Sequence, residues 1–156
     1  MPSAGASGHD LDRELNELLQ ELRVILPGIQ VLFAFLLIVP FSDLFHTAGG
    51  TTETAYFVAF AMTALAYVCT IAPGVQHRLR WRRHDKEILL RTANRLTLTA
   101  TALIGVAIAT VVFLITEYLY GSTVGAVCAA VVAALAGILW WGLPIAREHQ
   151  QERGSR

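Results

Sequence analysis

The side chains of this chain that could do chemistry lie mostly outside its apolar segments. Asp43 and His46 follow the first apolar segment, and they would share one helical turn if that helix continued past Pro40. A carboxylate and an imidazole placed in this way could bind a proton or a divalent cation. A metal site would need two more ligands, so a solvated loop is the favoured interpretation and no metal site is predicted.

Gln30 is the strongest polar group near the middle of the first apolar segment. Its amide could bond to a neighbouring helix, or it could form a polar pathway together with Asp43 and His46. Transport of protons or ions usually leaves an ionisable residue inside the membrane. The four apolar segments contain no Asp, Glu, Lys, Arg or His, which favours the hydrogen-bonding role for Gln30.

Motifs typical of enzymes are missing from the sequence. It has no GxSxG, HExxH, Walker or Rossmann pattern. Cys69 and Cys128 lie inside apolar segments, outside any CxxC or Cys/His cluster, and such cysteines usually pack as small apolar residues. We therefore expect a protein that is not an enzyme and that binds no cofactor.

Four apolar segments are each close to the length of helix that crosses a bilayer, which is about 20 residues. The chain has 156 residues, of which 54% are hydrophobic and 15% charged. Polar and apolar positions do not alternate, so helices are predicted rather than a barrel. The predicted fold is an all-α membrane protein with four transmembrane helices in two antiparallel hairpins. A single domain is expected over residues 10–147, with disordered tails at 1–9 and 148–156 and spans at about 24–41, 55–73, 96–116 and 123–143.

All 12 Lys and Arg residues fall on one side of these spans. They precede the first span, separate the second from the third, or follow the fourth, whereas the connections at 42–54 and 117–122 contain none. Because basic loops stay in the cytoplasm, both termini are predicted to be cytoplasmic. The expected location is the cytoplasmic membrane.

Small residues recur every four positions on the third and fourth spans, which puts them on one face of each helix. Small faces let helices approach closely in lipid, so these two spans are expected to pack tightly together; the alternative is a homodimer face. Pro27 is expected to kink the first helix, whereas Pro40, Pro73 and Pro144 are expected to end helices. The packing residues proposed are Gly105, Gly121, Gly125, Ala129, Ala133 and Gly137.

Residues 10–23 are predicted to form a cytoplasmic amphipathic helix with one leucine stripe and one acidic face. Its net charge over 10–21 is −4, from five acidic residues less one arginine, whereas residues 76–95 carry +5, from seven basic residues less two acidic ones. We expect the acidic helix to dock on this basic loop, or else the loop to hold anionic lipid headgroups. No nucleic-acid-binding module accompanies the loop. The candidate docking residues are Arg78, Arg82, Arg83 and Arg91.

Two stretches of the sequence carry a family resemblance, "NELLQELRVILPGIQVLFAFLLIVPF" at 16–41 and "IAPGVQHRLRWRRHDKEILLRTANRL" at 71–96. They resemble an uncharacterised family of small bacterial four-helix membrane proteins, over about residues 10–147. Members commonly have Thr-Gly where this chain has Pro27-Gly28. The resemblance implies a bacterial membrane protein. Some members are labelled sodium:proton antiporters, but these spans lack the buried carboxylate that coupled exchange ordinarily requires.

The expected function is that of a structural or interaction protein in the membrane. Its expected partners are membrane lipids and either further copies of itself or another membrane protein, and not nucleic acid. The alternative is a small proton or cation transporter, or a channel subunit, that acts as an oligomer. An oligomer is needed in that case because four narrow spans with small-residue faces leave little room for a pore.

Overall fold

The computed structural model describes residues 4–46, 49–80 and 86–142, and this part of the chain is helical with no strand. Four of its helices are long and apolar enough to cross a membrane, which confirms the predicted all-α fold with four such helices. The elements are α1 (Ala4–Ile38), a 3-10 turn (Val39–Phe41), α2 (Asp43–His46), α3 (Gly50–Arg80), α4 (Lys86–Tyr120), α5 (Ser122–Gly137) and a π-helical turn (Ile138–Gly142).

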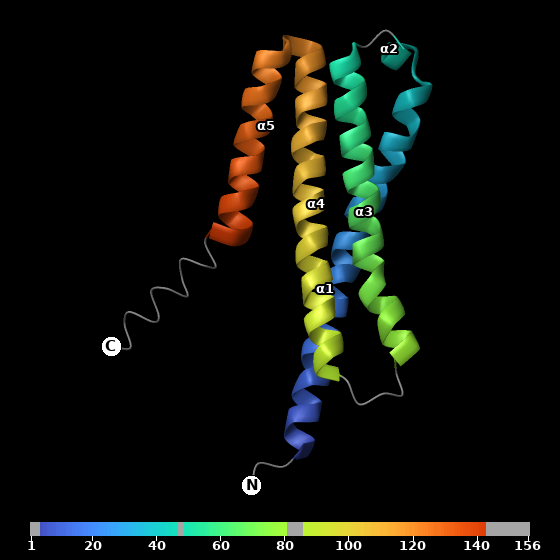
Figure 1. The fold of residues 1–156 in the computed structure, drawn as a ribbon, viewed down its shortest axis with the longest axis vertical. Coiled ribbons are helices and arrows are strands. Elements are labelled where there is room, and N and C mark those ends of the chain that lie inside the picture. Colours follow the sequence, from blue (N-terminus) through green and yellow to red (C-terminus); the bar gives the residue numbers. More distant parts are fainter. Residues whose placement is uncertain (1–3, 47–48, 81–85, 143–156) are drawn as a thin grey trace, which may run out of the picture.

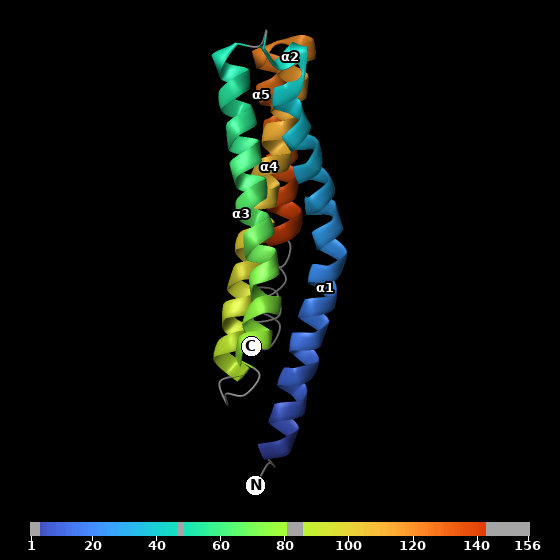
Figure 2. The same cartoon turned by 90° about the vertical axis from the view of Figure 1, so that its right-hand side faces the viewer.

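Helices α1, α3 and α4 form a three-helix unit, and α5 lies outside it (Figure 1). The most extensive contact joins α3 to α4, and α1 packs on both of them. Figure 2 shows α1 leaning along one side of the unit. In the described part of the chain, α5 packs along α4 and makes no comparable contact with α1 or α3.

The core of the three-helix unit is built mostly from residues at seven-residue spacings, which are large and aliphatic on α1 and mainly small on α3 and α4. This spacing keeps a residue on the same face of helices that cross at a shallow angle. Alanine and threonine allow the backbones of α3 and α4 to approach closely. The buried residues described on these helices are Leu22, Ile29 and Leu36 on α1, Ala55, Ala59, Thr63, Ala66, Thr70 and Pro73 on α3, and Ala93, Ala100 and Ala107 on α4.

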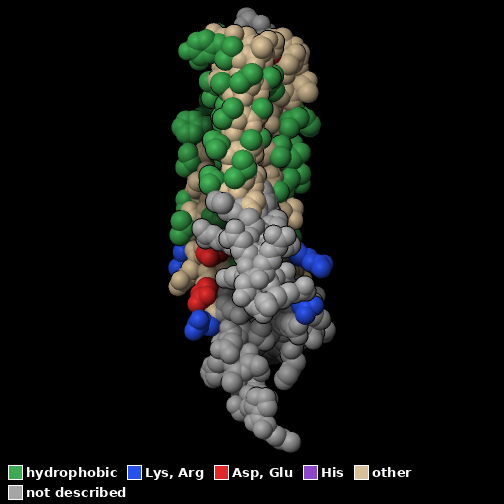
Figure 3. All heavy atoms as spheres, turned by 90° about the vertical axis from the view of Figure 1, so that its left-hand side faces the viewer, with side chains coloured by type: hydrophobic (Ala, Val, Ile, Leu, Met, Phe, Trp, Pro, Cys, Tyr) green, Lys and Arg blue, Asp and Glu red, His purple; other side chains and the backbone are tan. Residues whose placement is uncertain are grey.

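Helix lengths show how the bundle would sit across a bilayer. α5 and its π-helical turn have 16 and 5 residues, or about 30 Å together, which matches the hydrocarbon thickness. α4 has 35 residues, or about 50 Å. Because only Gly121 separates α4 from α5, the extra length of α4 projects from the opposite end. On the face shown in Figure 3, Lys and Arg side chains lie toward that end together with acidic ones, and hydrophobic side chains are spread along the part of the bundle beyond them.

Several sequence expectations about helix ends are wrong. Pro73 does not end the second span, because it is buried inside α3, which continues to Arg80. The expected connection at 117–122 shrinks to Gly121, since α4 continues to Tyr120. Gly121 has a φ of 90°, a left-handed conformation that glycine adopts without strain, and it reverses the chain.

The first span is not separate from the acidic segment. Residues 10–23 and the first span form one helix, α1, which contains Pro27 and begins at Ala4, within the segment expected to be a tail. Pro40 does mark the end of this helix, because α1 stops at Ile38 and Pro40 lies in the 3-10 turn. The expected tail at 148–156 and Pro144 lie outside the described residues.

Candidate functional site

Gln30 is paired with a neighbouring helix. Its side-chain amide donates a hydrogen bond to the hydroxyl of Tyr67, at 3.1 Å. Gln30 lies on α1 and Tyr67 on α3, so this bond joins two membrane-crossing helices. The structure thus places Gln30 in the interhelical bond that was its favoured role.

A row of aromatic rings continues from this bond along the contact between α1 and α3. Phe33 stacks on both Tyr67 and Phe60, with ring centroids 6.2 Å and 5.4 Å apart. Tyr56 lies next to Phe60 at 6.1 Å and meets the edge of Phe45 at 5.0 Å. Aromatic pairs at these distances attract one another beyond their burial. The row therefore links the C-terminal half of α1, together with α2, to α3.

The hydroxyl of Tyr56 forms a hydrogen bond with a backbone carbonyl in the last turn of α1. It donates to the carbonyl oxygen of Leu36 at 3.0 Å. In a continuous helix this carbonyl would accept from the N–H four residues later, but that residue is Pro40, which has no N–H. An unpaired carbonyl in a membrane costs free energy. Tyr56 supplies the missing donor from α3.

The other two residues of the predicted polar pathway lie on a different element from Gln30. Asp43 begins α2 and is exposed, and His46 ends it; the side chain of His46 lies outside the described part. Gln30 precedes Asp43 by 13 residues, or about 20 Å along a helix. Among the described residues, no group of three or more His, Cys, Asp and Glu side chains could hold a metal ion.

The hydroxyl groups of the spans are satisfied by their own helices. Each described threonine of this set donates to the carbonyl four residues earlier, at 2.7–3.0 Å. Because each of these hydroxyls already donates its proton to a carbonyl, none has a free donor for water in a hydrated path. The threonines are Thr63, Thr70, Thr97, Thr99, Thr101 and Thr110.

The basic candidate residues are described only in part. Arg78 on α3 and Arg91 on α4 are exposed, and Arg82 and Arg83 lie outside the described residues. An ion pair between Arg13 and Glu17, at 3.2 Å, lies within α1 on its exposed surface. Docking of the acidic segment on the basic loop therefore remains a prediction.

α4 and α5 make direct backbone contact at Gly125. A Cβ atom at this buried glycine would lie 3.0 Å from the nitrogen of Glu117 and 3.1 Å from the carbonyl oxygen of Phe113. Near the other end of α5, Trp140 lies over Gly105, where a Cβ would come within 3.0 Å of the indole ring. These two glycines let α5 lie close along α4.

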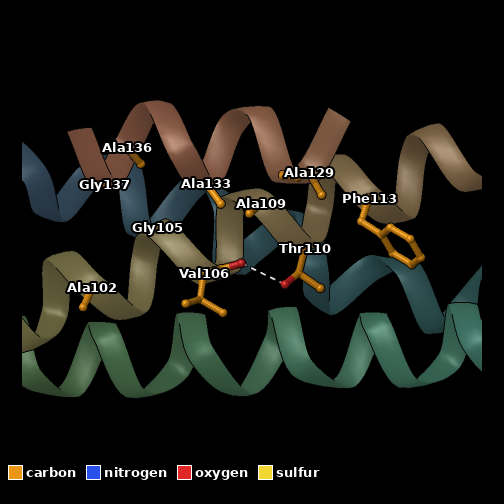
Figure 4. Close-up of a pocket in the computed structure, with 11 residues that line it drawn as sticks. Ala102, Gly105, Val106, Ala109, Thr110, Phe113, Ala129, Ala133, Ala136 and Gly137 are labelled. Atoms are coloured by element: carbon orange, nitrogen blue, oxygen red, sulfur yellow. Dashed lines mark hydrogen bonds between the residues drawn. The ribbon is translucent and has the colours of Figure 1, made fainter. Parts of the chain in front are cut away.

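An apolar groove of about 580 Å³ runs between α4 and α5 (Figure 4). Gly105 and Ala109 line it from α4, and Ala129, Ala133 and Gly137 line it from α5. Thr110 also faces the groove, but its hydroxyl donates to the carbonyl of Val106. Gly121, the remaining residue proposed for packing, forms the turn between the two helices.

Glu117 is not among the candidate residues predicted from the sequence. One of its carboxylate oxygens is buried and has no hydrogen-bond partner in the described part of the chain. Its position could have been foreseen, because Glu117 continues the four-residue spacing of Gly105, Ala109 and Phe113. Residues at that spacing share the face of α4 that meets α5.

Comparisons with known proteins place the chain in a family without assigning an activity. Neither the curated proteins nor the solved structures contain a match. A family model described as "Family of unknown function (DUF6328)" matches residues 6–144. The match covers nearly all of the four-helix bundle, and the chain belongs to this family.

Proposed function

We propose that this chain is a non-enzymatic membrane protein with a structural or interaction role, which assembles with further copies of itself or with another membrane protein. The observation that carries the proposal is the position of α5. Among the described elements, this helix makes extensive contact only with α4 and its own π-helical turn, and most of its described residues are exposed. The same helix pair carries the apolar groove with its small-residue lining.

The shape of the groove supports helix association. Helices in lipid gain little from burying apolar surface, because lipid is equally apolar, and they associate where small residues permit close packing. Ala129, Ala133 and Gly137 provide such a face on α5. Val131 and Leu135, each 53% exposed, lie on the opposite side of α5 from this face. The helix thus has two apolar surfaces, one with small and one with larger side chains, that suit packing against another helix.

Cysteine cross-linking in the membrane tests this proposal. The background variant replaces Cys69 and Cys128 by alanine, and a single cysteine is then introduced at Ala133 in the groove. We expect this variant to form cross-linked dimers with a short bifunctional maleimide. A matched variant with cysteine at Val68, which is exposed on α3, should stay monomeric. If both variants stay monomeric at native expression levels, self-assembly through α5 is wrong.

The alternative function, a small proton or cation transporter or channel subunit, is favoured by one observation. Glu117 on α4 has a buried carboxylate oxygen with no hydrogen-bond partner in the described part of the chain, and ionisable groups in membrane spans often serve transport. Proton or sodium flux into proteoliposomes tests this alternative. Flux that is lost in Glu117→Gln would support transport, and absence of flux in the wild type would exclude it under those conditions. Gln30→Leu and Asp43→Asn test the pathway predicted from the sequence.

The proposed location is the bacterial cytoplasmic membrane, with both termini in the cytoplasm. The distribution of basic residues supports this orientation, since neither connection at the opposite end, 42–54 or Gly121, contains Lys or Arg. The positively charged end of the bundle then faces the cytoplasmic leaflet, where anionic lipids are common.

A further inference from the structure

A second groove lies on α3, near the charged end of the bundle. It has a volume of about 290 Å³, and the described residues that line it are Ile71, Gly74, Val75 and Arg78. Their spacings of three, one and three residues place them on a single face of the helix. Three apolar positions are thus followed by one cation along this face.

Gly74 keeps the groove open. A Cβ atom at this position would meet nothing within 4 Å, so the missing side chain leaves space rather than a backbone contact. Val75 remains 48% exposed beside it. Arg78 is also exposed, and it has no hydrogen-bond or ion-pair partner among the described side chains. Because Arg78 is exposed, its guanidinium is accessible to a ligand.

Along α3, the groove extends from the level expected for lipid tails to the level expected for lipid headgroups. The apolar span on α3 ends at Gln76, and Arg78 is the first basic residue after it. Seven residues separate Ile71 from Arg78, which corresponds to about 10 Å along the helix. Ile71 thus lies within the hydrocarbon region, whereas Arg78 reaches the interface.

We propose that this groove binds one anionic phospholipid, with part of an acyl chain against Ile71, Gly74 and Val75 and the phosphate on Arg78. Guanidinium groups bind phosphate through paired N–H donors. The net charge of +5 over residues 76–95 favours an anionic headgroup over a zwitterionic one. The apolar walls favour a lipid over a free phosphate. This inference does not depend on self-assembly of the protein.

Native mass spectrometry of the full chain tests the site. The protein is purified in mild detergent and mixed with equal amounts of phosphatidylglycerol and phosphatidylcholine. We expect the wild type to retain more phosphatidylglycerol, and Arg78→Gln to lower this preference about fivefold, the effect of one basic residue near an anionic headgroup. Arg95→Gln is the matched control, because Arg95 is exposed on α4 and does not line the groove.

A second variant tests the groove itself. Gly74→Leu would place a side chain in the open space without removing a charge, and leucine favours the helix more than glycine does. We expect this variant to retain less phosphatidylglycerol than the wild type. In a separate competition experiment on the wild type, we expect that inorganic phosphate does not displace the bound lipid. The proposal would be overturned if Arg78→Gln and Arg95→Gln lowered the preference for phosphatidylglycerol equally, or if the wild type retained both lipids equally. It would also be overturned if inorganic phosphate displaced the lipid, or if Gly74→Leu retained as much phosphatidylglycerol as the wild type.

Discussion

At the scale of single residues, polar groups in the bundle are satisfied within their own helix or by the next one. Thr63 and Thr70 bond to carbonyls one turn earlier, and Gln30 bonds across to Tyr67. Tyr56 compensates for the N–H that Pro40 lacks. Glu117 is the exception among the described residues, because one buried oxygen has no partner. Stability should therefore fall when Tyr56 loses its hydroxyl, and by a smaller amount when Gln30 loses its amide.

Tyr56→Phe should destabilise the bundle by about 1–2 kcal/mol, because the carbonyl of Leu36 would lose its donor in an apolar environment. The same substitution should cost less in a Pro40→Ala background, where residue 40 can donate to that carbonyl. Steric trapping in bicelles measures the free energy of unfolding of all four variants in this cycle. Equal costs in the two backgrounds would show that the Tyr56 bond does not replace the missing N–H.

Gln30→Leu should cost only about 0.6 kcal/mol, the average for a hydrogen bond between membrane helices. Tyr67→Phe should cost a similar amount, and the double variant should cost little more than either single one, because both changes remove the same bond. The same unfolding measurement checks this expectation. Fully additive costs would indicate that the two side chains act independently.

At the scale of helices, the bundle consists of a closely packed unit and an added helix. Alanines at seven-residue spacings bury the contact between α3 and α4, while α5 approaches α4 most closely at Gly125 and Gly105. Sequence reasoning foresaw the small faces of α4 and α5. The sequence did not reveal that the most extensive contact joins α3 to α4. Apolar helices in lipid have no polar face to mark which side is buried, so the buried side is marked only by the size of its side chains.

Gly125→Ala should separate α5 from α4, since the added methyl group would lie 3.0 Å from the backbone nitrogen of Glu117, a contact that backbone atoms cannot relieve without shifting. A cost of about 1–3 kcal/mol is expected for such overpacking. Gly137→Ala is the matched control, because a Cβ there meets nothing within 4 Å. Cross-linking between cysteines on α4 and α5 should fall in the first variant alone; equal behaviour of both variants would contradict this contact.

At the scale of the whole molecule, the lengths of the apolar helices and the scarcity of charged residues within them are typical of a multi-pass membrane protein. The number of membrane-crossing helices was predictable from the apolar segments, because each needs only length and the absence of charge. Their true ends were not, since α1, α3 and α4 continue well beyond the apolar stretches. Pro73 illustrates the reason: packing in the three-helix unit sustains α3 past a residue that normally breaks a helix.

Cysteine accessibility in intact spheroplasts tests the four crossings and their orientation most directly. Single cysteines at Thr51 and Ser122 probe one end of the bundle, and cysteines at Asn16 and Asn94 probe the other; all four positions are exposed, and none of the changes alters charge. An impermeant maleimide should label Thr51→Cys and Ser122→Cys in intact spheroplasts, and Asn16→Cys and Asn94→Cys only after permeabilisation. Labelling of Asn16→Cys or Asn94→Cys in intact spheroplasts would contradict the proposed topology.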